Sequence, residues 1–289
     1  MNRSPSIDFS DVRRIAITAV FSDDFLFERV VLKGGNALAI VLAMGARTSL
    51  DLDFSIESDF EDLADVALRL EKALQNRFEA AGVIVFDFKF ERRPSTERAG
   101  QDQRWGGYVA SFKLADSARH KELAGDLPAL QREATLVGPG QQRVFTIDFS
   151  KYEYTKGKLA TDLDHYRIFV YTPEMIAIEK LRAICQQMPE YTLNRTPCPR
   201  ARDFFDIHLI LTTTDVDLCS STNLQITRDI FAAKDVPLYL LQFIEPQREF
   251  HRPDWDSVRI SSKQHLQDFD FYFDFVLKEV LSLQALWNE

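Results

Sequence analysis

The chain has 289 residues, of which 45% are hydrophobic and 27% are charged, and its formal net charge at pH 7 is −9. This composition is too apolar for a disordered protein and too charged for a membrane protein, and no apolar run approaches the roughly 20 residues that span a bilayer. The acidic net charge excludes a dedicated nucleic-acid binder with a basic surface all round, although it allows a local basic groove.

The N-terminal residues carry no apolar core segment and do not predict a signal peptide. The three cysteines, Cys185, Cys198 and Cys219, include no Cys-x-x-Cys pair, so neither a disulfide framework nor a zinc site is expected. Because free thiols persist in a reducing compartment, we expect a cytoplasmic protein.

The first elements along the chain predict a phosphate-binding turn. Residues 10–30 mix apolar and charged positions at helical spacing and lead into Lys33-Gly34-Gly35-Asn36. Residues 36–44 then predict a short apolar helix, with Gly45 as its stop. A glycine turn at a helix start favours phosphate, because the backbone N–H groups and the helix dipole attract anions.

Two acidic residues, Asp51 and Asp53, stand one residue apart in a predicted strand over residues 50–55. Side chains of a strand alternate with period two, so both carboxylates are expected on one face. Carboxylates held that close repel each other unless a cation lies between them, and Mg²⁺ is a common solution. Lys33 and Arg47 flank the pair, where each could neutralise it, bind phosphate or simply lie on the surface.

A small sheet is predicted from the rest of the first half. A helix begins at the capping-box pattern of residues 58–61 and ends near Gly82. Strands are expected at residues 83–90, 108–114 and 143–149, with an arginine-rich hairpin loop over 91–107 and helical segments within 117–135. Together with the Asp-x-Asp strand they predict a sheet of four or five strands.

A third carboxylate is needed to complete a metal site of this kind, and it usually comes from a neighbouring strand. Asp148 is our candidate because its neighbours on both sides are apolar, and Asp87 is the alternative. Asp148 is equally well explained as an ordinary residue near a strand end.

After about residue 165 the pattern becomes helical. Thr172 suits a helix N-cap and Pro173 suits the first helical position, so a helix is expected to about Met188. We predict an α+β protein with an α/β domain over residues 1–165 and a helical domain over 166–289. Further helices are expected at residues 200–211, 220–233, 236–243 and 265–286.

The predicted helices of the second half carry one charged constellation. Lys180 lies off the centre of the apolar face of its predicted helix. A lysine on the solvated side of a helix would occupy the same kind of position. Asp203 and Asp206 are three residues apart and share a helix face, and Arg202 could pair with Asp206 four positions later. Paired charges on a helix are usually structural.

Four segments occur in order along the chain: Leu32-Lys33-Gly34-Gly35, Arg47-x-Ser49-x-Asp51-Leu52-Asp53-Phe54-Ser55, Glu179-Lys180-Leu181-Arg182-Ala183 and Arg200-Ala201-Arg202-Asp203-x-x-Asp206. In this order they resemble the AbiEii/AbiGii toxin family of the DNA polymerase β-like nucleotidyltransferase superfamily. The resemblance covers residues 31 to about 212. It implies a polymerase β-like mixed sheet with helices, followed by a helical C-terminal half.

The resemblance also implies roles for individual residues. The glycine turn would cradle the nucleotide triphosphate, the Asp-x-Asp pair would hold Mg²⁺, and the helical domain would contribute a lysine and an acid to the same site. The implied nucleotide-binding residues are Lys33, Gly34, Gly35, Asn36, Arg47 and Ser49; the catalytic residues are Asp51, Asp53, Lys180, which would contact the phosphates, and Asp203, with Arg202 and Asp206 in support. Asn36 departs from the pattern, because a Ser or Thr often follows the turn.

The activity implied by the resemblance is a Mg²⁺-dependent toxin of a bacterial toxin–antitoxin, abortive-infection type system. It would transfer nucleotides from an NTP to RNA, such as the 3′ end of tRNA, and a separately encoded antitoxin would silence it. An alternative keeps the fold but modifies a small molecule resembling an aminoglycoside, or a protein hydroxyl. A non-catalytic module that binds NTP is a third hypothesis, and the intact acidic and lysine motifs count against it.

Overall fold

The structure is a computed structural model in which the chain divides into two compact units, each described here by itself. The described residues of the first unit lie within 7–36 and 51–170, and those of the second within 37–42 and 171–288. Arg47 and Ser49 lie outside the described residues. The structure describes residues 7–42, 51–95, 106–123, 125–137, 141–193, 196–261 and 265–288.

The first unit contains one mixed sheet of seven strands in the order β3-β4-β5-β2-β1-β7-β6. Strands β2 and β5 pair in parallel, as do β1 and β7, whereas the other neighbours are antiparallel. The α+β class and the mixed sheet are therefore confirmed, but the expected number of strands was too low. The strands are β1 (Val30–Lys33), β2 (Leu52–Ile56), β3 (Val83–Arg93), β4 (Gly107–Asp116), β5 (Phe145–Ser150), β6 (Leu159–Leu163) and β7 (Tyr166–Val170).

The helices of the first unit begin at side-chain caps. Asp62 accepts hydrogen bonds from the backbone N–H groups of Ala64 and Asp65, both at 3.0 Å, so its helix starts after the predicted capping box rather than within it. Helix α3 begins in the first unit, and its residues from 37 onward belong to the second. The helices are α1 (Phe9–Val20), α2 (Asp24–Arg29), α3 (Gly34–Val41), α4 (Leu63–Glu79), α5 (Ser117–Glu122) and α6 (Leu127–Glu133).

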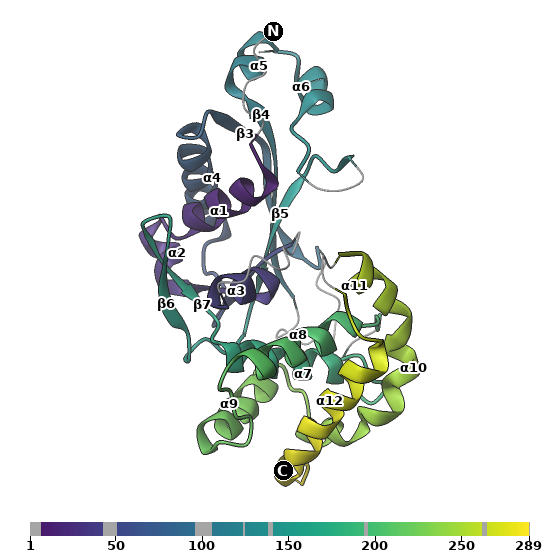
Figure 1. Cartoon of the computed structure of the whole chain (residues 1–289). Helices are drawn as coiled ribbons and strands as arrows, with labels where there is room; N and C mark the ends of the chain where they lie inside the picture. The colour runs from purple at the N-terminus through teal and green to yellow at the C-terminus, as the bar shows by residue number, and fades with distance from the viewer. Residues whose placement is uncertain are drawn as a thin grey trace. The chain divides into compact units, whose positions relative to one another are not determined.

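An aromatic core covers one face of this sheet. Helices α1 and α4 lie side by side (Figure 1), and Phe78 of α4 packs on Phe112 with ring centroids 5.8 Å apart. Phe21, just after α1, contacts Phe54 at 5.8 Å, and Phe54 stacks on Phe149 at 5.4 Å across β2 and β5. Because strand side chains alternate, the residues next to Phe54 and Phe149 point to the opposite face of the sheet.

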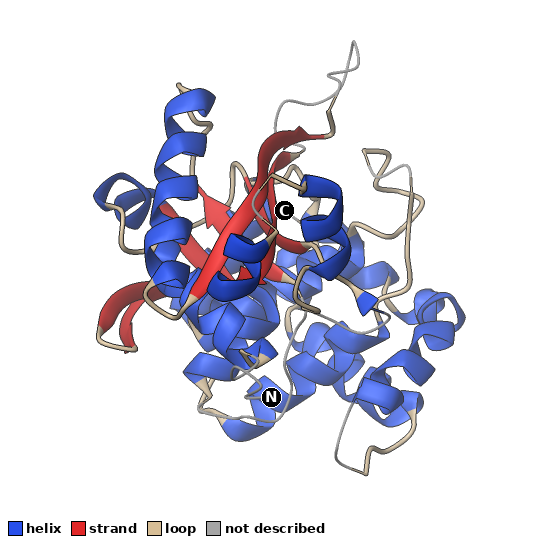
Figure 2. Cartoon of the chain, turned by 90° about the horizontal axis from the view of Figure 1, so that it is seen from above, coloured by secondary structure: helices blue, strands red, loops and turns tan. Residues whose placement is uncertain are grey.

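The second unit is helical, and its helices are among those drawn in blue in Figure 2. Its described residues contain no strand. Thr172 caps its first helix as predicted, accepting from the Met175 N–H at 3.4 Å. The predicted helix over 236–243 is a 3₁₀ segment, Leu238–Phe243. The α-helices are α7 (Pro173–Cys185), α8 (Ala201–Thr213), α9 (Ser221–Ala232), α10 (Arg248–His251), α11 (Trp255–Ser261) and α12 (Phe269–Ser282).

The aromatic run at the start of α12 is helical as expected, and one side of it lies in the core. Phe269 and Phe273 are buried, and both contact Phe204 of α8, with ring centroids 5.5 and 4.9 Å away. None of the helices within the described ranges is long and apolar enough to cross a bilayer.

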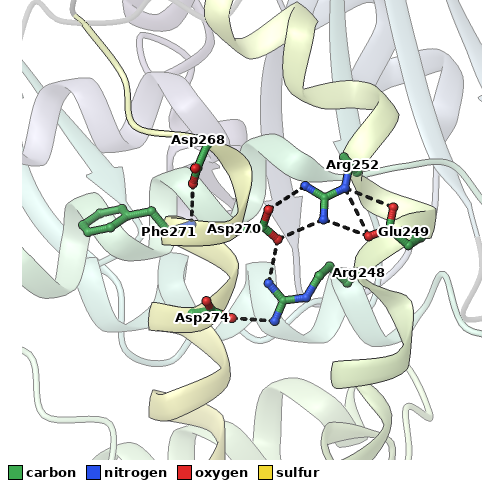
Figure 3. A network of polar contacts seen from close by, with 7 residues as sticks. All are labelled: Arg248, Glu249, Arg252, Asp268, Asp270, Phe271 and Asp274. Carbon is green, nitrogen blue, oxygen red and sulfur yellow. Dashed lines mark hydrogen bonds and ion pairs between the residues drawn. The ribbon is translucent and has the colours of Figure 1, made fainter.

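Charged side chains tie the start of α12 to α10 and the turn that follows it (Figure 3). Arg252 donates to both oxygens of Asp270, at 2.8 and 2.9 Å, and Arg248 donates to the same carboxylate at 2.8 Å and also contacts Asp274. Hydrogen bonds from Arg252 and then from Arg248 lower the pKa of Asp270 to about 2. Asp270 therefore stays charged across the physiological pH range and holds α12 in place.

Candidate active site

The centre of the sheet in the first unit carries a row of charged side chains. Asp53 on β2 is the register partner of Lys33 on β1 and of Asp148 on β5. Paired positions on neighbouring strands present their side chains to the same face, so the three lie together on the face opposite Phe54 and Phe149. We call Lys33, Asp53 and Asp148 the charged row.

Asp51 does not lie on a strand, contrary to the expectation. Strand β2 begins at Leu52, and Asp51 occupies the exposed bend before it. Asn36 holds this bend: its side chain is 7% exposed, and its Nδ2 donates to the carbonyl oxygen of Asp51 at 2.7 Å. The start of α3 therefore fixes the backbone just before Asp53.

Gly34 brings the start of α3 against the carboxylate of Asp53. Its φ of +69° is strained for any other residue type, and a Cβ added there would lie 2.9 Å from Asp53 Oδ2. Only glycine adopts this φ without strain and also leaves room for the Asp53 carboxylate. The arrangement places a helix N-terminus, with its free N–H groups and positive dipole end, beside the charged row.

Asp148 is surrounded by charges of both signs. Burial raises the pKa of its carboxyl above the ordinary value, whereas the charge of Arg93, which also donates to Oδ1 at 2.9 Å, lowers it. Asp51 raises the same pKa and Lys33 lowers it, each through its charge. A half-desolvated carboxylate in this setting favours a neighbouring cation.

Lys33 is largely buried and pairs with an acid that the sequence did not reveal. Its ammonium lies 3.3 Å from Oε1 of Glu153, and the two side chains are 10% and 4% exposed. Glu153 follows β5 in an irregular segment, and no spacing or motif marks it. Lys33 is therefore a buried counter-ion at the edge of the charged row.

Asp87, the alternative third carboxylate, is engaged elsewhere. It accepts from Lys113 at 2.6 Å and from Gln131 at 2.9 Å, and the hydrogen bond from Lys113 lowers its pKa. It lies at an irregularity of β3, and β4 separates β3 from β5. The structure brings Asp148, and not Asp87, next to Asp53.

The charged row has the donors that a hard divalent cation prefers. Within the described ranges, no three acidic, histidine or cysteine side chains are grouped so as to hold a metal by themselves. Mg²⁺ needs fewer protein ligands, because it usually binds one or two carboxylates and completes its shell with water and substrate phosphates. The carboxylates of Asp53 and Asp148 are therefore suited to hold Mg²⁺ whose remaining ligands come from elsewhere.

The second unit holds a separate buried cluster on α7 and α8. The Nζ atom of Lys180 lies 2.7 Å from Oδ1 of Asp203 and 2.9 Å from Oδ2 of Asp206, and Arg200 contacts the other oxygen of Asp203. Lys180, Asp203 and Asp206 are all less than a tenth exposed. Sequence spacing suggested Arg202 as a partner of Asp206, and the structure shows that Asp206 pairs with Lys180.

The charges of this cluster stabilise one another. Burial by itself would lower the pKa of Lys180, but the charges of Asp203 and Asp206 outweigh it and raise that pKa. Burial would likewise raise the pKa of Asp203, but Arg200 and then Lys180 hold it well below its ordinary value. Lys180 and Asp203 are therefore both charged in the folded protein.

His251 supports the beginning of α8. Its side chain is fully buried, and Nδ1 accepts a hydrogen bond from the backbone N–H of Arg200 at 3.0 Å. Burial lowers the pKa of His251 to about 4, so the ring is neutral at physiological pH. Sequence reasoning missed this residue, because no metal-ligand or catalytic spacing surrounds it.

The comparisons with known proteins come from a family profile and from solved structures. The profile described as "Nucleotidyl transferase AbiEii toxin, Type IV TA system" matches residues 15–275. No curated protein sequence matches the chain significantly.

Ten solved chains resemble this one, including the following three. JHP933 from Helicobacter pylori is 15% identical with a TM-score of 0.47, and the match covers 100% of this chain and 94% of that one. A putative nucleotidyltransferase from H. pylori is 16% identical with a TM-score of 0.42, with 99% and 96% covered. An antigenic nucleotidyltransferase-like protein from Paracoccidioides brasiliensis is 15% identical with a TM-score of 0.38, with 89% and 95% covered.

Proposed function

Because the chain belongs to the AbiEii nucleotidyltransferase toxin family of type IV toxin–antitoxin systems, we propose that it is a Mg²⁺-dependent enzyme that transfers nucleotides from an NTP to RNA. The acceptor in this proposal is the 3′ end of tRNA, and the setting is the bacterial cytoplasm, where a separately encoded antitoxin counteracts the enzyme. The observation that carries the proposal is the pairing of Asp53 with Asp148 beside the start of α3.

The first unit would bind the metal and the triphosphate. Asp53 and Asp148 would hold Mg²⁺, with Asp51 beside them, and the bound metal would neutralise the charge that develops on the transferred phosphoryl group. The N–H groups at Gly34 and Gly35 would receive the phosphates, because a helix N-terminus attracts anions. Arg47 and Ser49 remain predicted phosphate ligands. Lys33 and Asn36 were also predicted to bind the nucleotide. In this structure Lys33 pairs with Glu153, and Asn36 donates to the backbone carbonyl of Asp51.

In the reaction, a ribose 3′-hydroxyl of the acceptor would attack the α-phosphorus of the NTP. A new phosphorus–oxygen bond forms, the bond to the β-phosphate oxygen breaks, pyrophosphate leaves with the electrons of that bond, and the hydroxyl proton passes to solvent water. Positioning and charge stabilisation supply most of the catalysis in such transfers. A rigid pair of carboxylates on adjacent strands suits this task.

The second unit would contribute Lys180 and Asp203, with Asp206 and Arg202 in support. Lys180 would contact the nucleotide phosphates and Asp203 would be the essential acid of the final motif. Both oxygens of Asp203 already carry cationic partners, and Lys180 lies between two carboxylates. The Lys180 ammonium has three N–H donors and these carboxylates accept two of them, so a phosphate would bind the third without displacing either acid.

A second candidate keeps the chemistry and changes the acceptor to a cationic small molecule of the aminoglycoside kind, or to a protein hydroxyl. The net charge of −9 favours a cationic acceptor over RNA by simple electrostatics.

The test is transfer from each of the four α-labelled NTPs to total bacterial tRNA with Mg²⁺. The proteins compared are the wild type, Asp53→Asn and Asp148→Asn. Label on tRNA that disappears in both variants supports the proposal and identifies the nucleotide. Absence of label with every NTP removes tRNA as the acceptor, and the same variants are then assayed with aminoglycosides and with bacterial protein extracts.

A further inference from the structure

Arg93 is the last residue of β3 and reaches across the sheet to the charged row. Its Nη1 donates to Oδ1 of Asp148 at 2.9 Å, although β4 lies between β3 and β5. The side chain of Arg93 is 71% exposed, whereas that of Asp148 is 28% exposed. A largely solvated cation therefore rests on a partly desolvated carboxylate.

The backbone around Arg93 brings the strands close enough for this contact. Arg93 is the register partner of Gly107 on β4, and Gly107 is in turn paired with Ser150 on β5. A Cβ on Gly107 would lie 1.8 Å from the carbonyl oxygen of Phe149, so only glycine allows this approach. With no side chain at 107 between them, the guanidinium can pass over β4 to Asp148.

Arg93 donates to Oδ1 of Asp148, which is one of the two oxygens with which this carboxylate could bind a metal. A carboxylate oxygen that accepts a charge-assisted hydrogen bond gives part of its electron density to that cation. A guanidinium and a divalent cation also repel each other at contact distance. The Arg93 guanidinium and a metal on the Asp148 carboxylate therefore compete with each other.

We propose that Arg93 is a built-in counter-ion of Asp148 that a divalent cation displaces, and that the freed guanidinium then binds the triphosphate that accompanies the cation. This inference rests on the proposed function and deepens it. Arginine suits the second role because its planar fork binds phosphate oxygens in pairs. The distance it must travel is short, since the start of α3 lies against Asp53, the neighbour of Asp148.

The test measures binding and does not depend on turnover. The Kd for Mn²⁺ is measured from the electron paramagnetic resonance signal of free MnCl₂, without nucleotide, for wild type, Arg93→Ala and Arg92→Ala. Arg92 is the matched control: it is the neighbouring residue of the same strand and carries the same charge, but its guanidinium lies over the ring of Tyr108, 5.7 Å from the centroid. The Kd for each of the four NTPs is then measured with Mn²⁺ present.

We expect Arg93→Ala to bind Mn²⁺ about three- to fivefold more tightly than wild type, because Mn²⁺ no longer competes with one partly exposed ion pair. We also expect this variant to bind its NTP several-fold more weakly. Arg92→Ala should match wild type for Mn²⁺. The proposal is overturned if Arg93→Ala fails either expectation, or if Arg92→Ala tightens Mn²⁺ binding equally, since net charge alone would then account for the effect.

One further variant separates this proposal from the proposed function. If Asp53→Asn weakens Mn²⁺ binding while Arg93→Ala leaves it unchanged, only the counter-ion exchange fails. If Asp53→Asn and Asp148→Asn both bind Mn²⁺ like wild type, the metal site itself is wrong, and the inference falls with it.

Discussion

Asp53 and Asp148 are direct register partners across the parallel pair of β2 and β5. Two carboxylates in adjacent positions on one sheet face repel each other, and the fold retains them at a cost to its own stability. Buried or crowded charges that a fold retains at such a cost are often functional. The pair is therefore the first place to test the proposed chemistry.

Replacing either acid with its uncharged isostere should separate activity from stability. We expect Asp53→Asn and Asp148→Asn each to reduce nucleotide transfer by about a hundredfold or more, the order seen when one electrostatic contact to a transition state is removed. Their melting temperatures should change little, because each variant removes a repulsion, and the ion pair with Arg93 that Asp148→Asn also loses is partly exposed. Asp87→Asn is the control, and its transfer activity should equal that of wild type. Full activity in Asp148→Asn would exclude this residue from the site.

A pair of glycine variants tests whether Gly34 positions Asp53. Gly34→Ala and Gly82→Ala both force an alanine to positive φ, at +69° and +76°, which costs about 1 kcal/mol of unfolding free energy in each. The added Cβ meets Asp53 Oδ2 only at position 34, since nothing lies within 4 Å at position 82. Urea unfolding should therefore show similar losses, whereas transfer activity should fall only in Gly34→Ala. Equal activities would mean that Asp53 tolerates displacement.

The buried cluster of the second unit predicts a large stability effect at Lys180. Lys180→Met leaves Asp203 and Asp206 without their shared cation, and breaking a buried pair in this way costs about 3–5 kcal/mol. Lys180→Arg should lose less, because it keeps the charge. Lys278, exposed on α12, is the control, and its methionine variant should stay within about 0.5 kcal/mol of wild type. A Lys180→Met protein as stable as wild type would show that the cluster is not a structural unit.

His251 predicts a loss of stability in mild acid. Its pKa is about 4 in the folded protein and 6.5 ordinarily, so the unfolded chain binds the proton first as the pH falls. The stabilisation is complete above about pH 6.5 and is lost progressively toward pH 4, by about 3 kcal/mol in total. Urea unfolding at several pH values measures this slope.

The control for that slope is His251→Asn, whose Oδ1 can still accept from the Arg200 N–H but does not titrate. Its unfolding free energy should be lower at pH 7, because the smaller side chain leaves a cavity, yet it should change less between pH 6.5 and 4. An unchanged slope would assign the acid sensitivity to other groups.

The sequence predicted the parts of this fold that local patterns determine. Strands β3, β4 and β5 were expected because β-branched and aromatic residues recur in each, and Thr172 identified the start of α7. Strand β1 was missed because all four of its residues are buried, so it shows no alternation. Strand β6 was missed for the opposite reason, since it lies at the sheet edge with its side chains mostly exposed or half-buried.

The residues of the candidate site were also predictable only where a local pattern marks them. Asp53 stands in a recognisable motif, and Lys180 and Asp203 follow it in a familiar order. Asp148 could only be one of two candidates, because the choice of a parallel neighbour for β2 depends on the whole sheet. Glu153 had no local signal, and Arg93 stood only in an arginine-rich stretch predicted as a hairpin loop, because each acts on a residue far away in the chain.

The topology of β2 and β5 also has a consequence for the order in which the protein is made. These strands are neighbours in the sheet, but β3 and β4 are synthesised between them. Contacts between distant segments form late, because the intervening chain must first be ordered. A chain still emerging from the ribosome therefore carries Asp53 without Asp148. We expect a toxin built in this way to be inactive while it is being translated, and to gain activity only when β5 pairs with β2.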